Sequence, residues 1–310
     1  MKPLSDSMPL VTMVIPSYNH SLYVKETILS VVNQTYQNIE LIIIDDGSND
    51  DSSEIIQTLH SLCLARFVRF EFLRQQNRGL ASVINQAIQW GRGKYFATLA
   101  SDDMILPEKT EKTVSLLENM EDVIVACGAA TVIDEEGEVI GGIKTEQRSY
   151  DWKDAILHEY VLCAPTQLIR FDALRSIGGI PGHIKIEDWY LWIKLTEDGK
   201  KIFTTNEILA LYRRHRENYS SKRDGLLQAR LDVLEYAKSS RYYSASCARV
   251  YLMAAIDFGE TNKVKALSHI VAAVKHKNNV IMSRSLVYAL LKVFIPAALG
   301  DLLRSYRGRP

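Results

Sequence analysis

The sequence has few cysteines and no uninterrupted apolar run long enough to cross a membrane. Its four cysteines, Cys63, Cys127, Cys163 and Cys247, show no CxxC spacing. They therefore argue against a zinc site or a disulfide framework and indicate small core residues in a reducing compartment. The apolar segment Met8–Ile15 is short and lacks a basic flank, so it predicts a first strand and no signal peptide.

The formal net charge of zero conceals an uneven distribution of charge along the chain. Residues 263–310 hold nine Lys and Arg against one acid, Asp301, a net charge of +8, so residues 1–262 carry −8. The hydrophobic content of 47% and the charged content of 24% are ordinary for a soluble globular protein. A chain of 310 residues can form one large domain with an extension. We expect no nucleic-acid partner.

Two adjacent carboxylates, Asp102 and Asp103, come soon after the mostly apolar run 95–100. Pro107 then suits the first turn of a helix, where its missing N–H costs nothing. The pattern is a buried strand, an acidic turn and a helix, and ligands of open α/β sheets bind beyond the carboxyl ends of the strands. Two such acids repel each other unless a metal or a diphosphate-bound cation joins them. The alternative is a simple turn in which an aspartate caps the helix.

Strand and helix patterns alternate along the chain. Strand-like runs occupy 11–15, 39–44, 67–73 and 95–100, and helical spacing occupies 22–32, 52–62 and 80–90. This alternation predicts a parallel sheet with Rossmann-like crossovers. The later pattern predicts helices over 107–120, 150–158 and 186–195, strands over 123–127, 165–170 and 201–213, and a hairpin over 130–143. Residues 224–310 have helical spacing, so we expect an α/β domain over 1–223 and a helical, basic region over 224–310.

Four short motifs stand at the ends of predicted strands or at the start of a predicted helix. They are Val-Ile-Pro-Ser-Tyr-Asn at 14–19, Ile-Ile-Asp-Asp-Gly-Ser at 43–48, the pair Asp102-Asp103, and Glu-Asp-Trp at 187–189. Together, in this order, they resemble the family 2 glycosyltransferases of the GT-A fold, especially the single-transfer enzymes of bacterial surface-polysaccharide assembly. The likeness covers residues 9–220. It implies a GT-A, Rossmann-like mixed sheet, mainly parallel and flanked by helices, with a C-terminal helical extension.

The resemblance implies a nucleotide-sugar donor bound by the first two motifs. Tyr18, in a loop with Pro16 and Asn19, would lie against the uracil face, where a ring supplies apolar area at low entropy cost. Asp46 would accept a hydrogen bond from the base N3–H, which favours UDP, although dTDP offers the same contact. Arg78 would lie near the base and the diphosphate. A solvated turn arginine is an equal alternative at that position.

The resemblance also implies a divalent cation, Mn²⁺ or Mg²⁺, bridging the donor phosphates. Asp103 would bind it and Asp102 would meet the ribose or a metal-bound water, while His215 approaches the metal or the diphosphate. Many relatives carry a further acid in an Asp-x-Asp-Asp pattern, and here that position is Ala100. The loop 211–220 around His215 contains three arginines, which would favour closure over a phosphate or else form a solvated basic loop.

The last motif implies the base of an inverting reaction. Asp188 would deprotonate the acceptor hydroxyl, and direct attack would invert the anomeric centre; a positioned base contributes about 10²–10⁴ in rate. Glu187 lies about 100° away around a helix, so the two cannot serve equally, and Asp188 is preferred. No Gln-x-x-Arg-Trp motif of the processive synthases is present. A single hexosyl or N-acetylhexosaminyl transfer to a glycan or polyprenyl-linked saccharide is therefore expected.

Two other functions are compatible with part of this pattern. A sugar nucleotidyltransferase shares the sheet and the metal-binding acids, but it carries a Gly-rich loop after the first strand, and none follows Ile15 here. A non-catalytic nucleotide-sugar-binding subunit of an assembly complex is the other, and the presence of both Asp103 and Asp188 argues against it.

The sequence does not specify what the basic C-terminal region binds. Residues 280–299 are largely apolar, but Arg284, Lys292 and Pro296 interrupt them, so a spanning helix is not expected. Two interpretations follow. These residues pack against the catalytic domain or a second copy of the chain, or they lie on a membrane. Anionic lipid attracts each nearby Lys or Arg by about 1 kcal/mol. We therefore expect a cytoplasmic protein with reversible binding of 263–310 to the inner face of the cytoplasmic membrane.

Overall fold

The computed structural model describes residues 8–216, 218, 223–259, 261–276 and 284–294. The chain divides into two compact units. The first consists of residues 1–155 and 160–215, and the second of residues 156–159 and 216–310. Most of the loop after Arg216, and residues 280–283 and 295–299 of the apolar stretch, lie outside the described residues.

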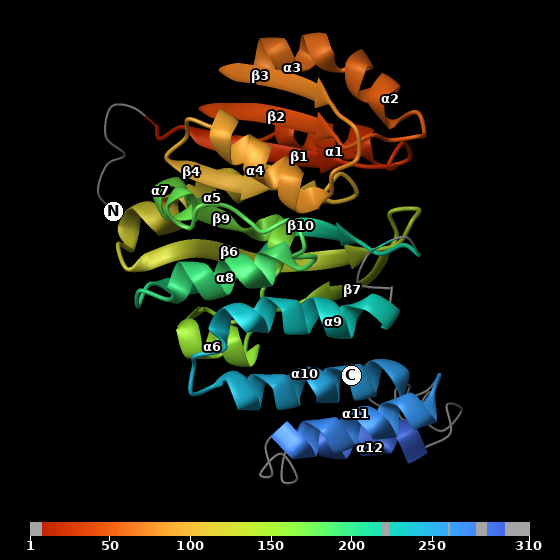
Figure 1. Ribbon diagram of the computed structural model, residues 1–310. Helices are drawn as coiled ribbons and strands as arrows, with labels where there is room; N and C mark the ends of the chain where they lie inside the picture. The colour runs from red at the N-terminus through yellow and green to blue at the C-terminus, as the bar shows by residue number, and fades with distance from the viewer. Residues whose placement is uncertain (1–7, 217, 219–222, 260, 277–283, 295–310) are drawn as a thin grey trace. The chain divides into compact units, whose positions relative to one another are not determined.

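The first four strands form a parallel sheet in the order β3, β2, β1, β4 (Figure 1). Their bounds are Val11–Ser17 for β1, Ile39–Asp45 for β2, Arg69–Arg74 for β3 and Tyr95–Thr98 for β4. Every residue of β2 and nearly every residue of β1 is buried, as expected for central strands covered on both faces. The connecting helices are α1 (Val24–Val32), α2 (Ser52–Thr58), α3 (His60–Arg66) and α4 (Leu80–Trp90).

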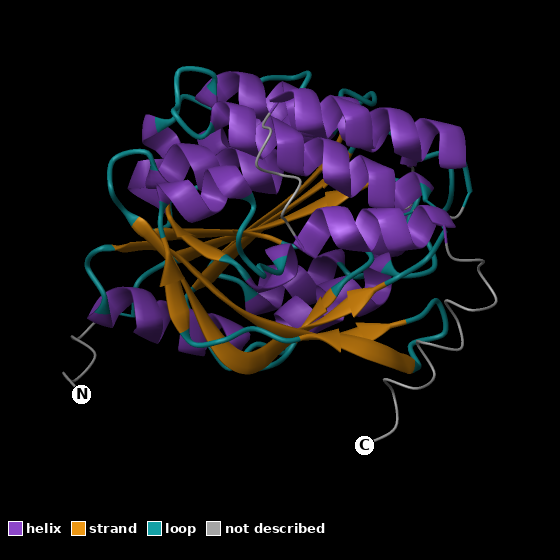
Figure 2. Cartoon of the chain, turned by 90° about the horizontal axis from the view of Figure 1, so that it is seen from below, coloured by secondary structure: helices purple, strands orange, loops and turns teal. Residues whose placement is uncertain are grey.

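The remaining strands extend this sheet beyond β4 and pair mostly in antiparallel fashion. The order continues β9, β6, β10, β5, with β7 beside β6 and β8 beside β10. Their bounds are Met104–Ile105 (β5), Val123–Ile133 (β6), Val139–Ile143 (β7), Arg148–Tyr150 (β8), Leu168–Arg170 (β9) and Lys201–Arg213 (β10). Among the described strands, only the pairs within the set β1, β2, β3 and β4, and the pair of β6 with β10, are parallel. Figure 2 shows the strands twisting progressively across the sheet, as sterically preferred.

The other helices of the chain's first part mostly follow the predicted pattern. They are α5 (Lys109–Asn119), α6 (Trp152–Leu157), a 3₁₀ turn (Ala164–Thr166), α7 (Phe171–Ser176) and α8 (Glu187–Thr196). The single helix predicted over 52–62 is two helices, because Leu59 N–H bonds to the Ile56 carbonyl (3.0 Å) and tightens the turn there. The helix predicted over 186–195 is present as α8, and it is buried over most of its length. β5, β8 and α7 were not predicted, being too short to show a period.

The second unit is helical, as the sequence predicts. It contains α9 (Arg223–Leu234), a 3₁₀ turn (Glu235–Ala237), α10 (Tyr243–Phe258), α11 (Lys263–His276) and α12 (Arg284–Phe294). The last three helices share a core of small and branched side chains that includes Leu252, Ala266 and Val293. Within the described residues, every helix is too short or too polar to cross a membrane.

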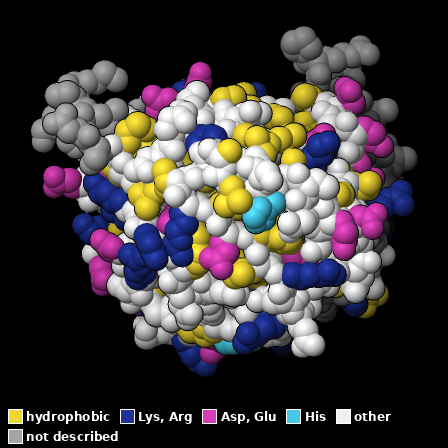
Figure 3. Space-filling model, turned by 90° about the horizontal axis from the view of Figure 1, so that it is seen from above, with side chains coloured by type: hydrophobic (Ala, Val, Ile, Leu, Met, Phe, Trp, Pro, Cys, Tyr) yellow, Lys and Arg dark blue, Asp and Glu magenta, His cyan; other side chains and the backbone are white. Residues whose placement is uncertain are grey.

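One face of the molecule is of mixed charge. On the face shown in Figure 3, basic and acidic side chains alternate with small groups of hydrophobic ones. All four cysteines are free and buried, which confirms the prediction that they are core residues.

Candidate active site

The carboxyl ends of β1, β2 and β4 lie together at one edge of the parallel sheet. The strand register sets Ser17, the last residue of β1, beside Asp45, the last residue of β2. β4 flanks β1 on the other side, and the acid pair follows it. At its own carboxyl end β10 pairs with β5, which starts at Met104 directly after the acid pair. The loops predicted to bind the donor and the cation therefore meet where ligands bind in open α/β sheets.

Asp46 anchors the loop that follows β3. Its Oδ1 accepts hydrogen bonds from Gln75 Nε2 (2.7 Å) and Arg78 N–H (2.9 Å), and its Oδ2 accepts one from Gly79 N–H (2.7 Å). The carboxylate is therefore fixed in direction. A carboxylate has about four acceptor sites, so Oδ2 retains one for an incoming N–H donor. The Arg78 side chain lies exposed in the same loop.

The loop after β1 is fixed by the loop after β2. Asn19 adopts φ of +53°, an unusual conformation for a non-glycine residue. Its N–H donates to Ser48 Oγ (2.9 Å), and its Oδ1 accepts from Asn49 N–H (2.8 Å). Tyr18, one residue earlier, is 44% exposed, and its ring is available to a ligand. Pro16 lies within β1 itself, in register with Ile44.

The two acids after β4 have different surroundings. Asp103 is buried; its Oδ1 accepts a hydrogen bond from Arg213 N–H (2.9 Å), and its carbonyl accepts one from Thr27 Oγ1 (2.7 Å). Burial raises the pKa of the Asp103 carboxyl well above its usual range, and the neighbouring charge of Asp102 raises it further. Asp102 instead points to histidine, since its Oδ2 lies 2.9 Å from His215 Nε2.

Three side chains from separate segments converge on one point. Donor atoms of His20, Asp102 and His215 all lie within 4.8 Å of one another. Asp102 Oδ2 is 3.9 Å from His20 Nε2, and the two imidazole rings stand at 88° with centroids 5.5 Å apart. Burial lowers the pKa of His20, which favours the neutral imidazole. Of the three residues that the resemblance assigns to the metal, two join this cluster, and Asp103 faces Arg213.

These donors fit a divalent cation. Carboxylate oxygen suits Mn²⁺ and Mg²⁺, and imidazole nitrogen suits the transition metals. Two ligands on perpendicular bonds about 2.1 Å long are about 3.0 Å apart. Asp102 Oδ2 and His215 Nε2 are at hydrogen-bond distance, 2.9 Å, which is also compatible with that spacing.

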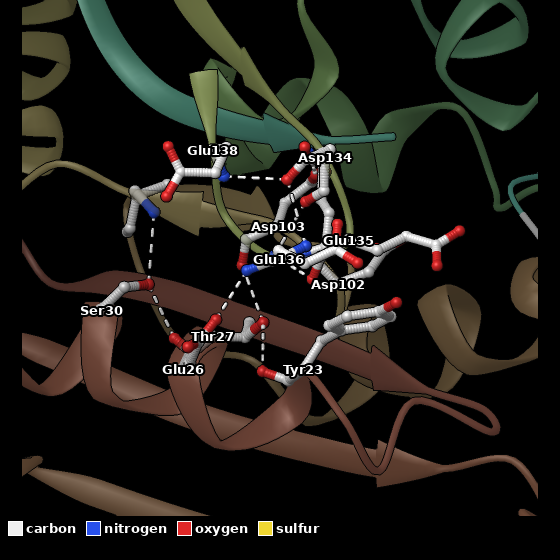
Figure 4. Close-up of polar contacts among 12 residues, drawn as sticks. Tyr23, Glu26, Thr27, Ser30, Asp102, Asp103, Asp134, Glu135, Glu136 and Glu138 are labelled. Atoms are coloured by element: carbon white, nitrogen blue, oxygen red, sulfur yellow. Dashed lines mark hydrogen bonds and ion pairs between the residues drawn. The ribbon is translucent and has the colours of Figure 1, made fainter. Parts of the chain in front are cut away.

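Arg213, the last residue of β10, holds the acid pair in place. Its buried guanidinium donates to the carbonyls of Asp102, Asp134 and Glu135 (each 3.1 Å) and to Glu26 Oε2 (2.6 Å). Figure 4 shows Glu26 of α1 facing the acid pair and the turn at 134–136. Every nitrogen of this arginine is thus engaged within the protein, so Arg213 is structural. Arg214 and Arg216 of the same predicted loop have exposed side chains.

Glu187 and Asp188 stand at the start of α8, which two tryptophans anchor. Trp189 Nε1 donates to the Ala155 carbonyl (2.8 Å), and Trp192 Nε1 donates to Gln167 Oε1 (3.2 Å). Burial raises the pKa of Asp188 to about 6, although its bond from Trp189 N–H (2.6 Å) opposes the rise. Burial and the Asp188 charge raise the pKa of Glu187 to about 8. Burial thus raises both pKa values, and the charge of Asp188 raises that of Glu187 further, so Asp188 is the more readily ionised of the two.

The surroundings of the Cys163 thiol connect the acid at the start of α8 with the acid pair. Burial raises the pKa of Cys163, and the charges of Asp103 and Asp188 both raise it further. Both carboxylates are therefore close enough to one thiol to act on it through the low-dielectric interior. Asp188 and the acid pair thus belong to one region of the first unit.

A family model described as glycosyl transferase family 2 matches residues 12–178, more than half of the chain. The chain belongs to this family. An uncharacterized glycosyltransferase of Methanocaldococcus jannaschii is 30% identical to it over 219 residues, which cover 69% of this chain and 74% of the relative. The family predicted from the four motifs is therefore confirmed.

Two solved structures resemble this family 2 glycosyltransferase in fold. S. aureus TarS 1–349 in complex with UDP-GlcNAc aligns with a TM-score of 0.66, covering 92% of this chain and 88% of that chain at 14% identity. The mannosyltransferase PcManGT from Pyrobaculum calidifontis, in complex with GDP-Man and Mn²⁺, aligns with a TM-score of 0.60, covering 94% and 88% at 15% identity. At such identities the likeness shows the fold alone, and it confirms the predicted fold class.

Three residues of this glycosyltransferase's site were not assigned a role from the sequence: His20, Glu26 and Ser101. Only His20 carries a sequence signal, because it directly follows the Tyr18–Asn19 motif at the end of a predicted strand. A histidine at such a strand end, in a chain with an acid pair at another, is a candidate ligand. Glu26 and Ser101 look like ordinary surface or turn residues in the sequence.

Proposed function

We propose that this family 2 glycosyltransferase moves a sugar from a nucleotide-sugar donor, a UDP-sugar, to a glycan or lipid-linked saccharide. The transfer is single, proceeds with inversion and serves surface-polysaccharide biosynthesis. The observation that carries the proposal is the meeting of the Asp46 loop, the acid pair and His215 at one sheet edge. The TarS complex with UDP-GlcNAc and the PcManGT complex with GDP-Man and Mn²⁺ support it as relatives in fold.

The donor base lies between Tyr18 and Asp46 in this proposal. Tyr18 offers an exposed ring to the base face, and stacking of such rings contributes about 0.5–1.5 kcal/mol beyond buried area. Asp46, held by three N–H donors, presents its remaining acceptor site to N3–H of uracil. Asn19 and Pro16 shape the same loop, and the exposed Arg78 guanidinium approaches the diphosphate.

Asp102, Asp103 and His215 hold the divalent cation in this proposal. A cation bound there supplies Lewis-acid stabilisation of the departing diphosphate. It would also offset the mutual repulsion of Asp102 and Asp103, which adds to burial in raising the pKa of Asp103. Arg213 keeps both acids in position, because its N–H donates to the Asp103 carboxylate and its Nε donates to the Asp102 carbonyl; it thus supports binding without contacting the donor.

Asp188 takes the proton of the acceptor hydroxyl. The hydroxyl oxygen attacks the anomeric carbon, the bond from that carbon to the diphosphate oxygen breaks, and the proton passes to Asp188. A pKa of about 6 suits this role, since the group is ionised at neutral pH yet basic enough to accept a proton. Attack from the side opposite the leaving group inverts the anomeric centre.

A screen of nucleotide sugars tests the proposed reaction. We expect UDP-sugars to raise the melting temperature with Mn²⁺ but not with EDTA, since a ligand at a hundredfold excess over Kd stabilises by about 2.7 kcal/mol. The stabilising donors are then assayed for turnover with polyprenyl-linked saccharides. Consumption of a nucleoside triphosphate with release of diphosphate would instead identify a nucleotidyltransferase. Tight donor binding without turnover on its cognate acceptor would identify a binding subunit.

We also propose that α11 and α12 of the second unit bind an anionic membrane surface. Both helices expose an apolar stripe at helical spacing on the side away from their shared core: Val264, Leu267 and Val271 on α11, and Val287, Leu291 and Phe294 on α12. Lysines at 263, 265 and 275 accompany these stripes, within a region of net charge +8. Exposed apolar area beside basic side chains is the pattern of interfacial helices.

Vesicle co-sedimentation of the full chain tests this membrane surface. Binding should rise with the fraction of anionic lipid and fall with salt. The double variant Val287→Glu/Phe294→Glu should lose at least about tenfold in binding, because it places charge on the inserted face. The matched variant Val139→Glu/Ile140→Glu changes two exposed residues of β7 and should bind as wild type. Equal loss in both variants, or none in the first, would contradict the assignment.

A further inference from the structure

We propose that His20 is a further protein ligand of the divalent cation, beside Asp102 and His215, and that it gives the site a preference for Mn²⁺ over Mg²⁺. The inference rests on the proposed function in one respect: the donor diphosphate supplies the ligands that complete the coordination. The protein ligands themselves follow from the geometry of the first unit. Donor atoms of these three residues lie within 4.8 Å of one another, from loops that follow β1, β4 and β10.

The backbone of His20 is held firmly on both sides. Its N–H donates to Ser52 Oγ (2.9 Å), at the start of α2. Its carbonyl accepts hydrogen bonds from the N–H groups of Tyr23 and Val24 (both 2.9 Å), where α1 begins. A residue fixed between two helix starts has little freedom to move, so the imidazole is preorganised as a ligand must be.

The imidazole is also oriented toward Asp102. His20 Nδ1 lies 2.8 Å from Ser101 Oγ, the residue directly before the acid pair. That hydrogen bond leaves Nε2 directed to Asp102 Oδ2, 3.9 Å away. Histidine ligands in metal sites almost always hydrogen-bond through the second ring nitrogen, which fixes the ring and its tautomer. The pair His20–Ser101 has this arrangement.

The spacing between His20 and Asp102 suits a shared cation better than a direct contact. A separation of 3.9 Å is too long for a hydrogen bond between His20 and Asp102. It is shorter than the roughly 4.2 Å that separates two ligands on opposite sides of one ion at about 2.1 Å. The His20 side chain is 21% exposed against 4% for His215, so the cluster opens to solvent on the His20 side. A donor diphosphate reaches the ion from there.

Two imidazoles change the metal preference of the site. Mg²⁺ favours oxygen ligands and retains water, whereas imidazole nitrogen binds transition metals more tightly. A cation site built from carboxylates and one imidazole admits both ions. A second imidazole from His20 shifts the preference toward Mn²⁺.

Titration of Mn²⁺ into the full chain, followed by electron paramagnetic resonance, tests the role of His20. The variant His20→Asn keeps a polar group in place of Nδ1, able to bond Ser101, and removes Nε2. We expect the Kd for Mn²⁺ to rise at least about tenfold, as loss of even an orienting partner costs about 10–100-fold. Mg²⁺ affinity should change by less than about threefold, because Mg²⁺ keeps water in place of nitrogen ligands. His60→Asn, on α3, is the matched control and should bind Mn²⁺ as wild type.

Pulsed resonance of bound Mn²⁺ separates ligation from loop positioning. The wild type should show two coordinated imidazole nitrogens, and His20→Asn and His215→Asn should each show one. A wild type with a single nitrogen, or wild-type Mn²⁺ affinity in His20→Asn, would overturn the proposal. Because Mn²⁺ is titrated without nucleotide, failure of every UDP-sugar to bind would refute the proposed function and leave this inference standing.

Discussion

Replacing Asp188 by Asn is expected to lower kcat at least about a hundredfold while the Kd for UDP stays near the wild-type value. The side chain stands at the start of a buried helix fixed by Trp189 and Trp192, so the substitution removes a proton acceptor and little else. Burst or single-turnover kinetics with a lipid-linked acceptor measures the chemical step, and calorimetry measures UDP affinity.

The neighbouring acid provides the control for this variant. Glu187→Gln should reduce kcat much less, because burial and the charge of Asp188 raise the pKa of Glu187 and leave Asp188 the more readily ionised acid. If Glu187→Gln proves the more damaging change, the two roles are reversed. The two variants conserve size and the helix start, so unfolding does not confuse the comparison.

The pH dependence of kcat follows from the same pair of carboxyls. The base must be ionised, and the raised pKa of Asp188, about 6, means that activity falls as the pH drops through that value. An ordinary exposed aspartate would keep activity to about pH 4. The acidic limb of the pH profile of kcat should therefore have its midpoint near pH 6 in the wild type. This limb should be absent from the residual activity of Asp188→Asn.

The second large effect is expected in the acid pair. Asp102→Asn should lower Mn²⁺-dependent UDP affinity more than about a hundredfold, beyond the 10–100-fold attributed to groups that only orient a ligand. Its carboxylate is the oxygen donor that faces both histidines. The same change should raise the stability of the metal-free protein, because it removes the charge that repels Asp103.

Asp103→Ala should also abolish Mn²⁺-dependent UDP binding, but with the opposite effect on stability. It leaves the buried Arg213 N–H without its acceptor, which costs about 1–3 kcal/mol. Calorimetry with UDP and Mn²⁺ and thermal melts in EDTA separate the two variants. Wild-type affinity in either one would remove that residue from the cation site.

Most helices and strands of this protein, and the strand ends at which its motifs stand, could be predicted from the sequence. The helix at Leu80–Trp90 and the strand at Lys201–Arg213 agree with the predicted ranges, because their periods depend only on residues a few positions apart. The glycine turns likewise show in the sequence, as at Gly137, where φ of +91° closes the predicted hairpin. The family was also identifiable from four motifs at the right strand ends.

Which side chains contact one another could not be predicted from the sequence, because these contacts depend on the tertiary structure. His215 and Asp102 are 113 residues apart, Arg213 and Glu26 are 187 apart, and His20 bonds to Ser101 across 81 residues. Local patterns of polarity record whether a residue is buried, not which distant loop packs beside it. Asp102 and Asp103 look equivalent in the sequence, yet the end of β10 holds one by its backbone N–H and directs a histidine to the other. That difference arises from strand order, which neighbouring residues do not specify.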